Sequence, residues 1–240
     1  MLLTQLFEAV NDNKHAAFVF GRMNPPTIGH KQLLDTAAKN ANGGDYFIFA
    51  SQTQDPKKNP LDFTTKLKFL SAMFPQHAKH IVANRELNTI MKVANWLYEQ
   101  GYRSVTFVAG SDRLDTFKKL LTDYNGNENN KHYYKFKDIN FISSGAREDG
   151  AEGLAGVSAS GARAAAVKGD KEAFAQATGA GKLTDALYQA VRKGMSVEEG
   201  ASGYIPKNKK EANDPRWSHA LTVDVHPDTP RKNAKALGLV

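Results

Sequence analysis

Ten consecutive residues near the start of the chain, positions 21–30, combine features that suit phosphate binding: Gly-Arg-Met-Asn-Pro-Pro-Thr-Ile-Gly-His. Gly21 ends an apolar run, where a missing side chain lets a ligand approach the backbone. Thr27 can cap the helix expected after the two prolines, and the free N–H groups of a helix start attract phosphate. Gly29 leaves room for a phosphate against the first turn, and the His30 imidazole can donate hydrogen bonds to phosphate oxygens. The segment is therefore predicted to bind a nucleoside triphosphate.

A second polar segment precedes a late helix and contains Ser158, Ser160 and Arg163. The two hydroxyls, together with helix N–H groups, can hold β- and γ-phosphates, and the guanidinium can pair with a phosphate through two hydrogen bonds. An alanine-rich capped helix without a binding role is the alternative. Gly110 and Asp112, after an apolar strand, form a third candidate, for which the alternative is that Asp112 only caps the next helix.

The first segment resembles the nucleotidyltransferase superfamily with the H/T-x-G-H signature, which includes cytidylyltransferases, phosphopantetheine adenylyltransferase and nicotinamide mononucleotide adenylyltransferases. The signature is matched by residues 27–30, Thr-Ile-Gly-His, preceded by Gly-Arg at 21–22 and Asn-Pro-Pro at 24–26. The threonine is similar to the phosphopantetheine branch, and the Gly-Arg opening to the nicotinamide mononucleotide branch. Residues 157–163 resemble the superfamily's Ile-Ser-Ser/Thr-Thr-x-x-Arg signature, although Gly161 and Ala162 are smaller than that pattern has.

The resemblance implies an enzyme that moves AMP from ATP to a phosphate-bearing acceptor similar to nicotinamide mononucleotide, with release of pyrophosphate. It implies that the catalytic residues are His30, Thr27 and Arg163. The nucleotide would be bound by Gly21, Arg22, Asn24, Gly29, His30, Gly110, Asp112, Ser158, Ser160 and Arg163. Mg²⁺ would bridge phosphate oxygens and need few protein ligands, so no side chain is assigned as a metal ligand. In some relatives a loop lysine after the second strand neutralises phosphate; Lys57 and Lys58 occupy that loop, with two solvated lysines as the alternative.

The spacing of apolar residues predicts the elements that position these side chains. Compact apolar runs predict strands over 16–20, 46–50, 80–83, 105–109 and 139–142. Amphipathic stretches predict helices over 27–39, 63–73, 89–100, 112–121, 160–167, 171–178 and 182–193. The alternation favours an α/β fold, a Rossmann-like parallel sheet with helices on both faces, plus a C-terminal helical part. In such sheets ligands bind beyond the carboxyl ends of the strands, and the Pro-Pro loop leaves the first strand at that end.

Two regions are predicted along the chain: a nucleotidyltransferase-like α/β domain over 1–195 and a C-terminal extended arm over 196–240. The apolar periodicity weakens in the arm, which holds several prolines and mixed charge. Its segments 203–210 and 214–221 loosely resemble arms on bacteriophage-encoded nucleotidyltransferase-like proteins. That resemblance implies a phage source and a homo-oligomer or assembly partner bound through residues 200–240; an extension folded on its own domain is the alternative.

Composition limits the function classes further. The 240 residues include no cysteine, which excludes disulfides, thiolate zinc sites and a cysteine nucleophile. The formal net charge of +7 suits anionic partners such as nucleotides. No apolar run reaches the roughly 20 residues that span a bilayer, and the first ten residues lack the pattern of a signal peptide. We therefore expect no membrane partner and a cytoplasmic location, or the host cytoplasm or virion for a phage protein.

Three alternative functions stay open. Cytidylyl transfer from CTP is disfavoured because the usual pattern of two histidines around x-Gly and the Arg-Thr-x-Gly-Ile-Ser stretch are absent. Nucleic-acid binding would need a clustered basic face or an aromatic platform, and no such motif is present. A structural component of a larger assembly, built on the same fold and attached through its C-terminal arm, is the third.

Overall fold

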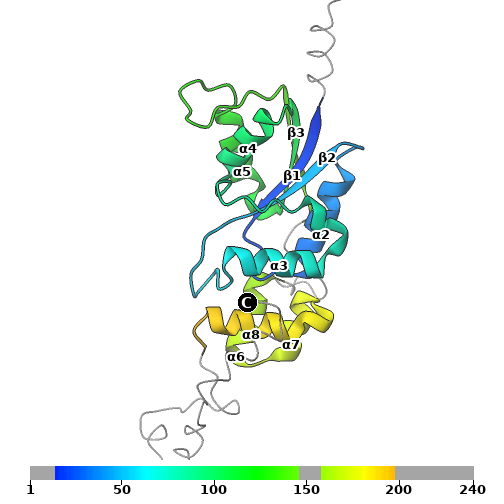
Figure 1. Cartoon of the computed structure of the whole chain (residues 1–240), viewed down its shortest axis with the longest axis vertical. Helices are drawn as coiled ribbons and strands as arrows, with labels where there is room; N and C mark the ends of the chain where they lie inside the picture. Colours follow the sequence, from blue (N-terminus) through cyan, green and yellow to red (C-terminus); the bar gives the residue numbers. More distant parts are fainter. Residues whose placement is uncertain (1–13, 146–157, 198–240) are drawn as a thin grey trace, which may run out of the picture. The chain divides into compact units, whose positions relative to one another are not determined.

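The structure is a computed structural model, and it describes residues 14–145 and 158–197. Within these residues a single parallel sheet has the strand order β2-β1-β3-β4 (Figure 1). Its strands are β1 (His15–Gly21), β2 (Asp45–Ala50), β3 (Ser104–Ala109) and β4 (Asp138–Ser143). The register pairs Gly21 with Ala50 and Ala109 with Ser143, so all four strands end at one edge. The predicted Rossmann-like α/β sheet is confirmed.

Helices cover both faces of this sheet. One face is packed by α2 (Ile28–Lys39) and α3 (Phe63–Met73), and the other by α4 (Ile90–Glu99) and α5 (Ser111–Asp123). Successive residues of β1 point to opposite faces: Phe18 belongs to the core under α4 and α5, and Val19 to the core under α2 and α3. Because both faces are covered, β1, β2 and β3 consist mostly of apolar residues.

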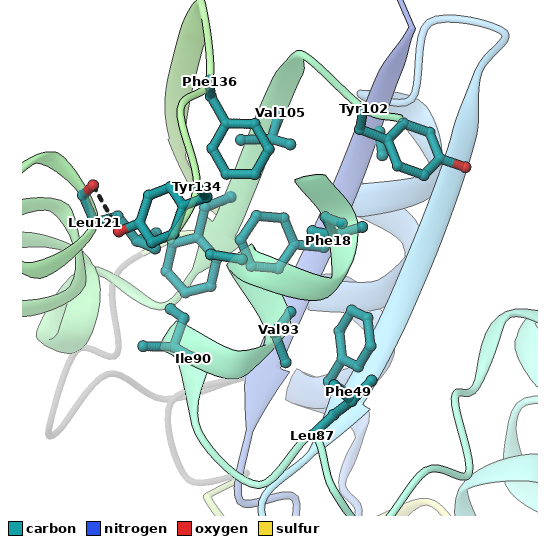
Figure 2. Packing of buried hydrophobic residues seen from close by; sticks show 14 of the residues in the cluster. Phe18, Phe49, Leu87, Ile90, Val93, Tyr102, Val105, Leu121, Tyr134 and Phe136 are labelled. Atoms are coloured by element: carbon teal, nitrogen blue, oxygen red, sulfur yellow. Dashed lines mark hydrogen bonds between the residues drawn. The ribbon is translucent and has the colours of Figure 1, made fainter. Parts of the chain in front are cut away.

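The core under α4 and α5 is rich in aromatic side chains, which Figure 2 shows gathered around Phe18. The rings of Phe18 and Phe107 lie 5.1 Å apart between centroids. Tyr134 is fully buried, and its hydroxyl donates to the Leu121 carbonyl at 2.9 Å, which satisfies the polar group inside an apolar core. The core therefore fixes the two strands that carry the candidate site, β1 and β3.

Three further helices, α6 (Ala159–Lys168), α7 (Lys171–Thr178) and α8 (Thr184–Gly194), form a third apolar cluster. Gly169 ends α6 in the left-handed conformation, at φ 80°, and Asp170 caps α7 at once by accepting from the Ala173 N–H at 2.9 Å. Leu61, from the segment before α3, is buried in the same cluster. The C-terminal helices are thereby tied to the loop that follows β2.

Most predicted elements agree with the structure within a few residues, but one strand prediction is wrong. Residues 75–80 form a 3-10 helix, and Ile81 makes only an isolated parallel bridge to Ile48 instead of the strand expected over 80–83. Pro75 favours the start of a helical turn, and the apolar run that follows, residues 81–83, is too short to continue the pairing. The predicted helix over 182–193 begins as a 3-10 turn at Gly181–Leu183 before α8.

The predicted arm lies outside the described residues from position 198 on. No helix in the described parts of the chain is long and apolar enough to cross a membrane.

Candidate functional site

A pocket lies at the carboxyl ends of β1 and β3; we call it the strand-end pocket. The chain leaves β1 toward β2 on one side of the sheet and later returns to β3 on the other side, so the order of strands reverses between β1 and β3. Ligands of open α/β sheets bind at such a switch point. The pocket is lined by Phe20, Gly21, Arg22, Met23, Asn24, His30, Leu33, Ala109, Gly110, Asp112, Arg113, Phe117, Ala159, Ser160 and Arg163.

The loop after β1 is held by its own buried polar group. Asn24 is 1% exposed, and its side chain donates to the Leu61 carbonyl at 2.8 Å and accepts from the Leu61 N–H at 3.0 Å. Met23 is buried with φ 46°, a left-handed conformation that is uncommon for a residue with a side chain. Neighbouring structure must hold the residue in this conformation, and the two Asn24–Leu61 bonds provide such an anchor.

Thr27 and His30 form a reciprocal contact at the start of α2. The Thr27 backbone N–H donates to His30 Nδ1 at 3.0 Å, and Thr27 Oγ1 lies 2.9 Å from the same nitrogen. Since Nδ1 accepts a hydrogen bond, the neutral ring carries its proton on Nε2. His30 is 8% exposed and lines the pocket, whereas Thr27 is 1% exposed and does not. Thr27 therefore orients the imidazole that faces the pocket.

The second predicted segment reaches the same pocket from α6. Arg163 donates through Nη1 to the Asn24 carbonyl at 2.7 Å and through Nη2 to Ser160 Oγ at 3.2 Å. The two residues of the first bond are 139 positions apart in the chain. Ser158 is the N-cap of α6, and its Oγ accepts from the Gly161 N–H at 2.9 Å. Ser158 is therefore occupied as the helix cap, and Ser160 is the serine of this segment that contacts Arg163.

The pocket has a positive character. Burial, and after it the positive charge of Arg22, lower the pKa of Arg163, while the negative charge of Asp55 acts in the opposite direction. A guanidinium stays protonated even when its pKa falls, so two like charges are held near one another. Arg113 adds a third guanidinium to the lining. Asp112 is the carboxylate of the lining. Three guanidinium groups and one carboxylate give the lining a net positive charge, which favours an anionic ligand.

The start of α5 forms the third wall. Gly110 is the N-cap of α5, and Asp112 stands in its first turn. Sequence reasoning missed Arg113, Phe20 and Phe117 here. Phe20 and Phe117 place their rings edge to face, 6.4 Å apart. The rule that ligands bind beyond strand ends could have pointed to Phe20 and Arg113, but Phe117 becomes a wall residue only through the packing of α5 on β1.

The predicted site residues thus fall into two groups. Eight line the strand-end pocket: Gly21, Arg22, Asn24, His30, Gly110, Asp112, Ser160 and Arg163. Three do not: Thr27 lies behind His30, Ser158 is engaged as a cap, and Gly29 is exposed on the first turn of α2. Lys57 and Lys58 are exposed in a turn whose backbone N–H groups both donate to Asp55 Oδ1, at 3.0 and 2.7 Å.

A resident metal ion finds few ligands. Across residues 14–145 and 158–197, no group of three or more His, Asp or Glu side chains is arranged to hold a metal ion. The pocket lining itself contains one carboxylate, that of Asp112. This donor set fits Mg²⁺ that arrives bound to phosphate oxygens and keeps most of its waters, since such an ion takes only one or two carboxylates from the protein.

Comparisons with models of known protein families, with curated proteins and with solved structures found no match.

Proposed function

We propose that the chain is a nucleotidyltransferase that moves AMP from ATP to a phosphate-bearing acceptor similar to nicotinamide mononucleotide, in the cytoplasm. The observation that carries the proposal is the bond from Arg163 to the Asn24 carbonyl, which joins the two signature-like segments at one pocket. A chance match to either short motif would not bring both to the carboxyl ends of β1 and β3. The clustering of Arg22 and Arg163 with a protonated imidazole nitrogen supports a polyphosphate ligand.

The chemical step needs no covalent intermediate with the protein. A phosphate oxygen of the acceptor attacks the α-phosphorus of ATP, the bond from that phosphorus to the bridging oxygen of the β-phosphate breaks, and pyrophosphate leaves with that oxygen. Catalysis is then positioning together with stabilisation of the charge that develops on the phosphate oxygens. These are tasks for fixed hydrogen-bond donors and cations.

The residues divide these tasks. His30 Nε2–H donates to an oxygen of the α-phosphate, and the Thr27 N–H holds the ring in that tautomer through Nδ1. Arg163, oriented by the Asn24 carbonyl and Ser160 Oγ, binds the leaving pyrophosphate together with the N–H groups at the start of α6. Asp112, the carboxylate of the lining, would hold Mg²⁺ that arrives with the triphosphate, and the ion would neutralise phosphate charge.

Release of pyrophosphate tests the proposal directly. Purified chain is incubated with ATP and Mg²⁺ and, in parallel, with CTP, each with nicotinamide mononucleotide, phosphopantetheine or a sugar phosphate as the acceptor. We expect release with ATP and one of these acceptors. His30→Ala is expected to cut turnover by about 10²–10³ with an unchanged circular dichroism spectrum, because one preorganised donor is lost. His132→Ala, a change outside the pocket lining, is the matched control.

Two results would count against the proposal. Absence of pyrophosphate release with every acceptor, together with no thermal shift on adding either nucleotide, would remove the assigned activity. Near-normal turnover of the His30→Ala variant would remove the role given to the imidazole.

A further inference from the structure

A lysine is buried at the base of the loop that follows β2. Lys66, on α3, is fully buried, and its ammonium group donates to the Ser51 carbonyl, one residue beyond the end of β2. Lysine is almost never fully buried without a charged partner in contact. In the described residues, Lys66 makes no salt bridge within 4.0 Å. Lys66 is therefore a buried amine whose hydrogen-bond acceptor is a neutral backbone carbonyl.

The contact closes the loop formed by residues 51–61, which we call the 51–61 loop. At its first residue the Ser51 N–H donates to the Gly21 carbonyl at 2.8 Å, so the loop begins beside the first residue of the phosphate-binding segment. At its last residue, Leu61 exchanges two hydrogen bonds with Asn24. Lys66 reaches back from α3 to the first residue, and both ends of the loop are thereby fastened next to β1.

The interior of the loop is ordered by Asp55. This carboxylate accepts from the backbone of Lys57 and Lys58 and, at 2.6 Å, from the Asn59 side chain. Two other polar atoms of the loop, Ser51 Oγ and Asn59 Oδ1, are buried without a hydrogen-bond partner in the described structure. The loop therefore retains polar groups that a segment selected only for stability would have satisfied or replaced.

The loop is coupled to the strand-end pocket at two places. Asn24, which binds the end of the loop, offers its backbone carbonyl to Arg163. The pKa of Arg163 is lowered by burial and by the charge of Arg22, and the negative charge of Asp55 is close enough to oppose this shift in part. A shift of the 51–61 loop would therefore move both the carbonyl that orients Arg163 and the carboxylate that balances it.

The fold gains little from the charge of Lys66. Burial lowers the pKa of Lys66 to about 8, and the nearby carboxylate of Asp62 opposes this only in part. A charged amine in this place destabilises the folded chain at neutral pH, because the charged form prefers water. A methionine has a similar length and could fill the same apolar space.

We propose that Lys66 is a positioning residue of the strand-end pocket: by holding the Ser51 carbonyl it fixes the 51–61 loop, and through Asn24 and Asp55 it sets the position of Arg163. The inference rests on the proposed function in one respect, namely that Arg163 binds pyrophosphate. The positioning itself depends only on the loop and the pocket.

The test compares four full-length chains: wild type, Lys66→Met, Lys68→Met and Ser51→Ala. Affinity for inorganic pyrophosphate is measured by titration calorimetry, and amide hydrogen exchange is followed in residues 51–61. We expect Lys66→Met to weaken pyrophosphate binding by about tenfold to a hundredfold, because a displacement near 1 Å has effects of that size. Exchange should rise in the 51–61 loop and stay unchanged in β1 and β3.

The two controls separate the contact from its surroundings. Lys68 is exposed two residues along α3, so Lys68→Met removes the same charge without touching the loop and should behave as wild type. Ser51→Ala removes an unpartnered hydroxyl and keeps the carbonyl that Lys66 binds, so it should also retain affinity and protection.

Two outcomes overturn the inference. Wild-type affinity and unchanged loop exchange in Lys66→Met would mean that the ammonium positions nothing. A Lys66→Met chain that does not fold, or that loses stability and affinity together, would make Lys66 an ordinary structural residue. Failure of the proposed function is distinct: wild type would release no pyrophosphate with any acceptor, while amide exchange in residues 51–61 would still report on Lys66.

Discussion

The free energy of unfolding of wild type, compared with that of Lys66→Met, should rise as the pH rises from 7 to 10. The pKa of Lys66 falls from the usual 10.5 to about 8 in the folded chain. Between these values the unfolded chain binds more protons than the folded chain, so wild type gains stability as the pH rises. The difference corresponds to a destabilisation of about 3 kcal/mol at pH 7 that shrinks to about 1 kcal/mol at pH 10. The free energy of unfolding of wild type should therefore rise by about 2 kcal/mol relative to that of the variant between pH 7 and pH 10.

A second contribution is the same at every pH. Without Lys66 the Ser51 carbonyl loses the ammonium donor, which costs about 1–3 kcal/mol and offsets the relief at pH 7. The two chains should therefore have similar free energies of unfolding at pH 7, and wild type should be the more stable at pH 10. Other titrating groups cancel because both chains contain them.

Urea unfolding followed by circular dichroism at pH 7, 8, 9 and 10 measures this difference, with Lys68→Met as the control that should show no trend. A difference that stays constant from pH 7 to pH 10, or a variant that gains on wild type as pH rises, would refute the claim that Lys66 is buried with a lowered pKa.

Three further predictions concern single contacts. Arg163→Lys keeps the charge but loses the fork that joins the Asn24 carbonyl to α6, so the Kd for pyrophosphate measured by calorimetry should rise by about tenfold with little change in melting temperature. Gly194→Ala would place a Cβ 2.1 Å from the Pro60 carbonyl oxygen. We expect the free energy of unfolding in urea to fall by about 1–3 kcal/mol. A variant as stable as wild type would contradict the packing of α8 on the 51–61 loop. Burial alone raises the pKa of Asp35, but hydrogen bonds from Lys31 and His77 lower it overall, so its carboxylate stabilises the fold above about pH 4 and the effect is lost below. Because the Asp35 side chain is 46% exposed, Asp35→Asn should cost less than about 1 kcal/mol at pH 7, and the urea curves should converge with wild type as the pH falls through the lowered pKa of Asp35.

The features of the candidate site that depend on short segments of the chain could be predicted from the sequence. The strand that ends at Gly21, the helix that starts after Thr27 and the Asp62 cap of α3 follow from residues within a few positions of one another. The Asp62 side chain accepts from the Thr65 N–H at 3.0 Å, as its position before an amphipathic run indicates. The strand predicted over 80–83 did not form, because the apolar run over residues 81–83 is too short to keep its pairing with β2 beyond one bridge.

By itself the sequence determined the residue types available at each strand end and the order of helices and strands, because periodicity, caps and turns depend on neighbours along the chain. Only the tertiary structure decided which of those residues share a pocket. Ser158 became a cap while Ser160 entered the lining, and Arg163 found its acceptor 139 residues away in Asn24. It also decided that Lys66 is buried against the Ser51 carbonyl, since burial is a property of helices and strands packed together and not of any single segment.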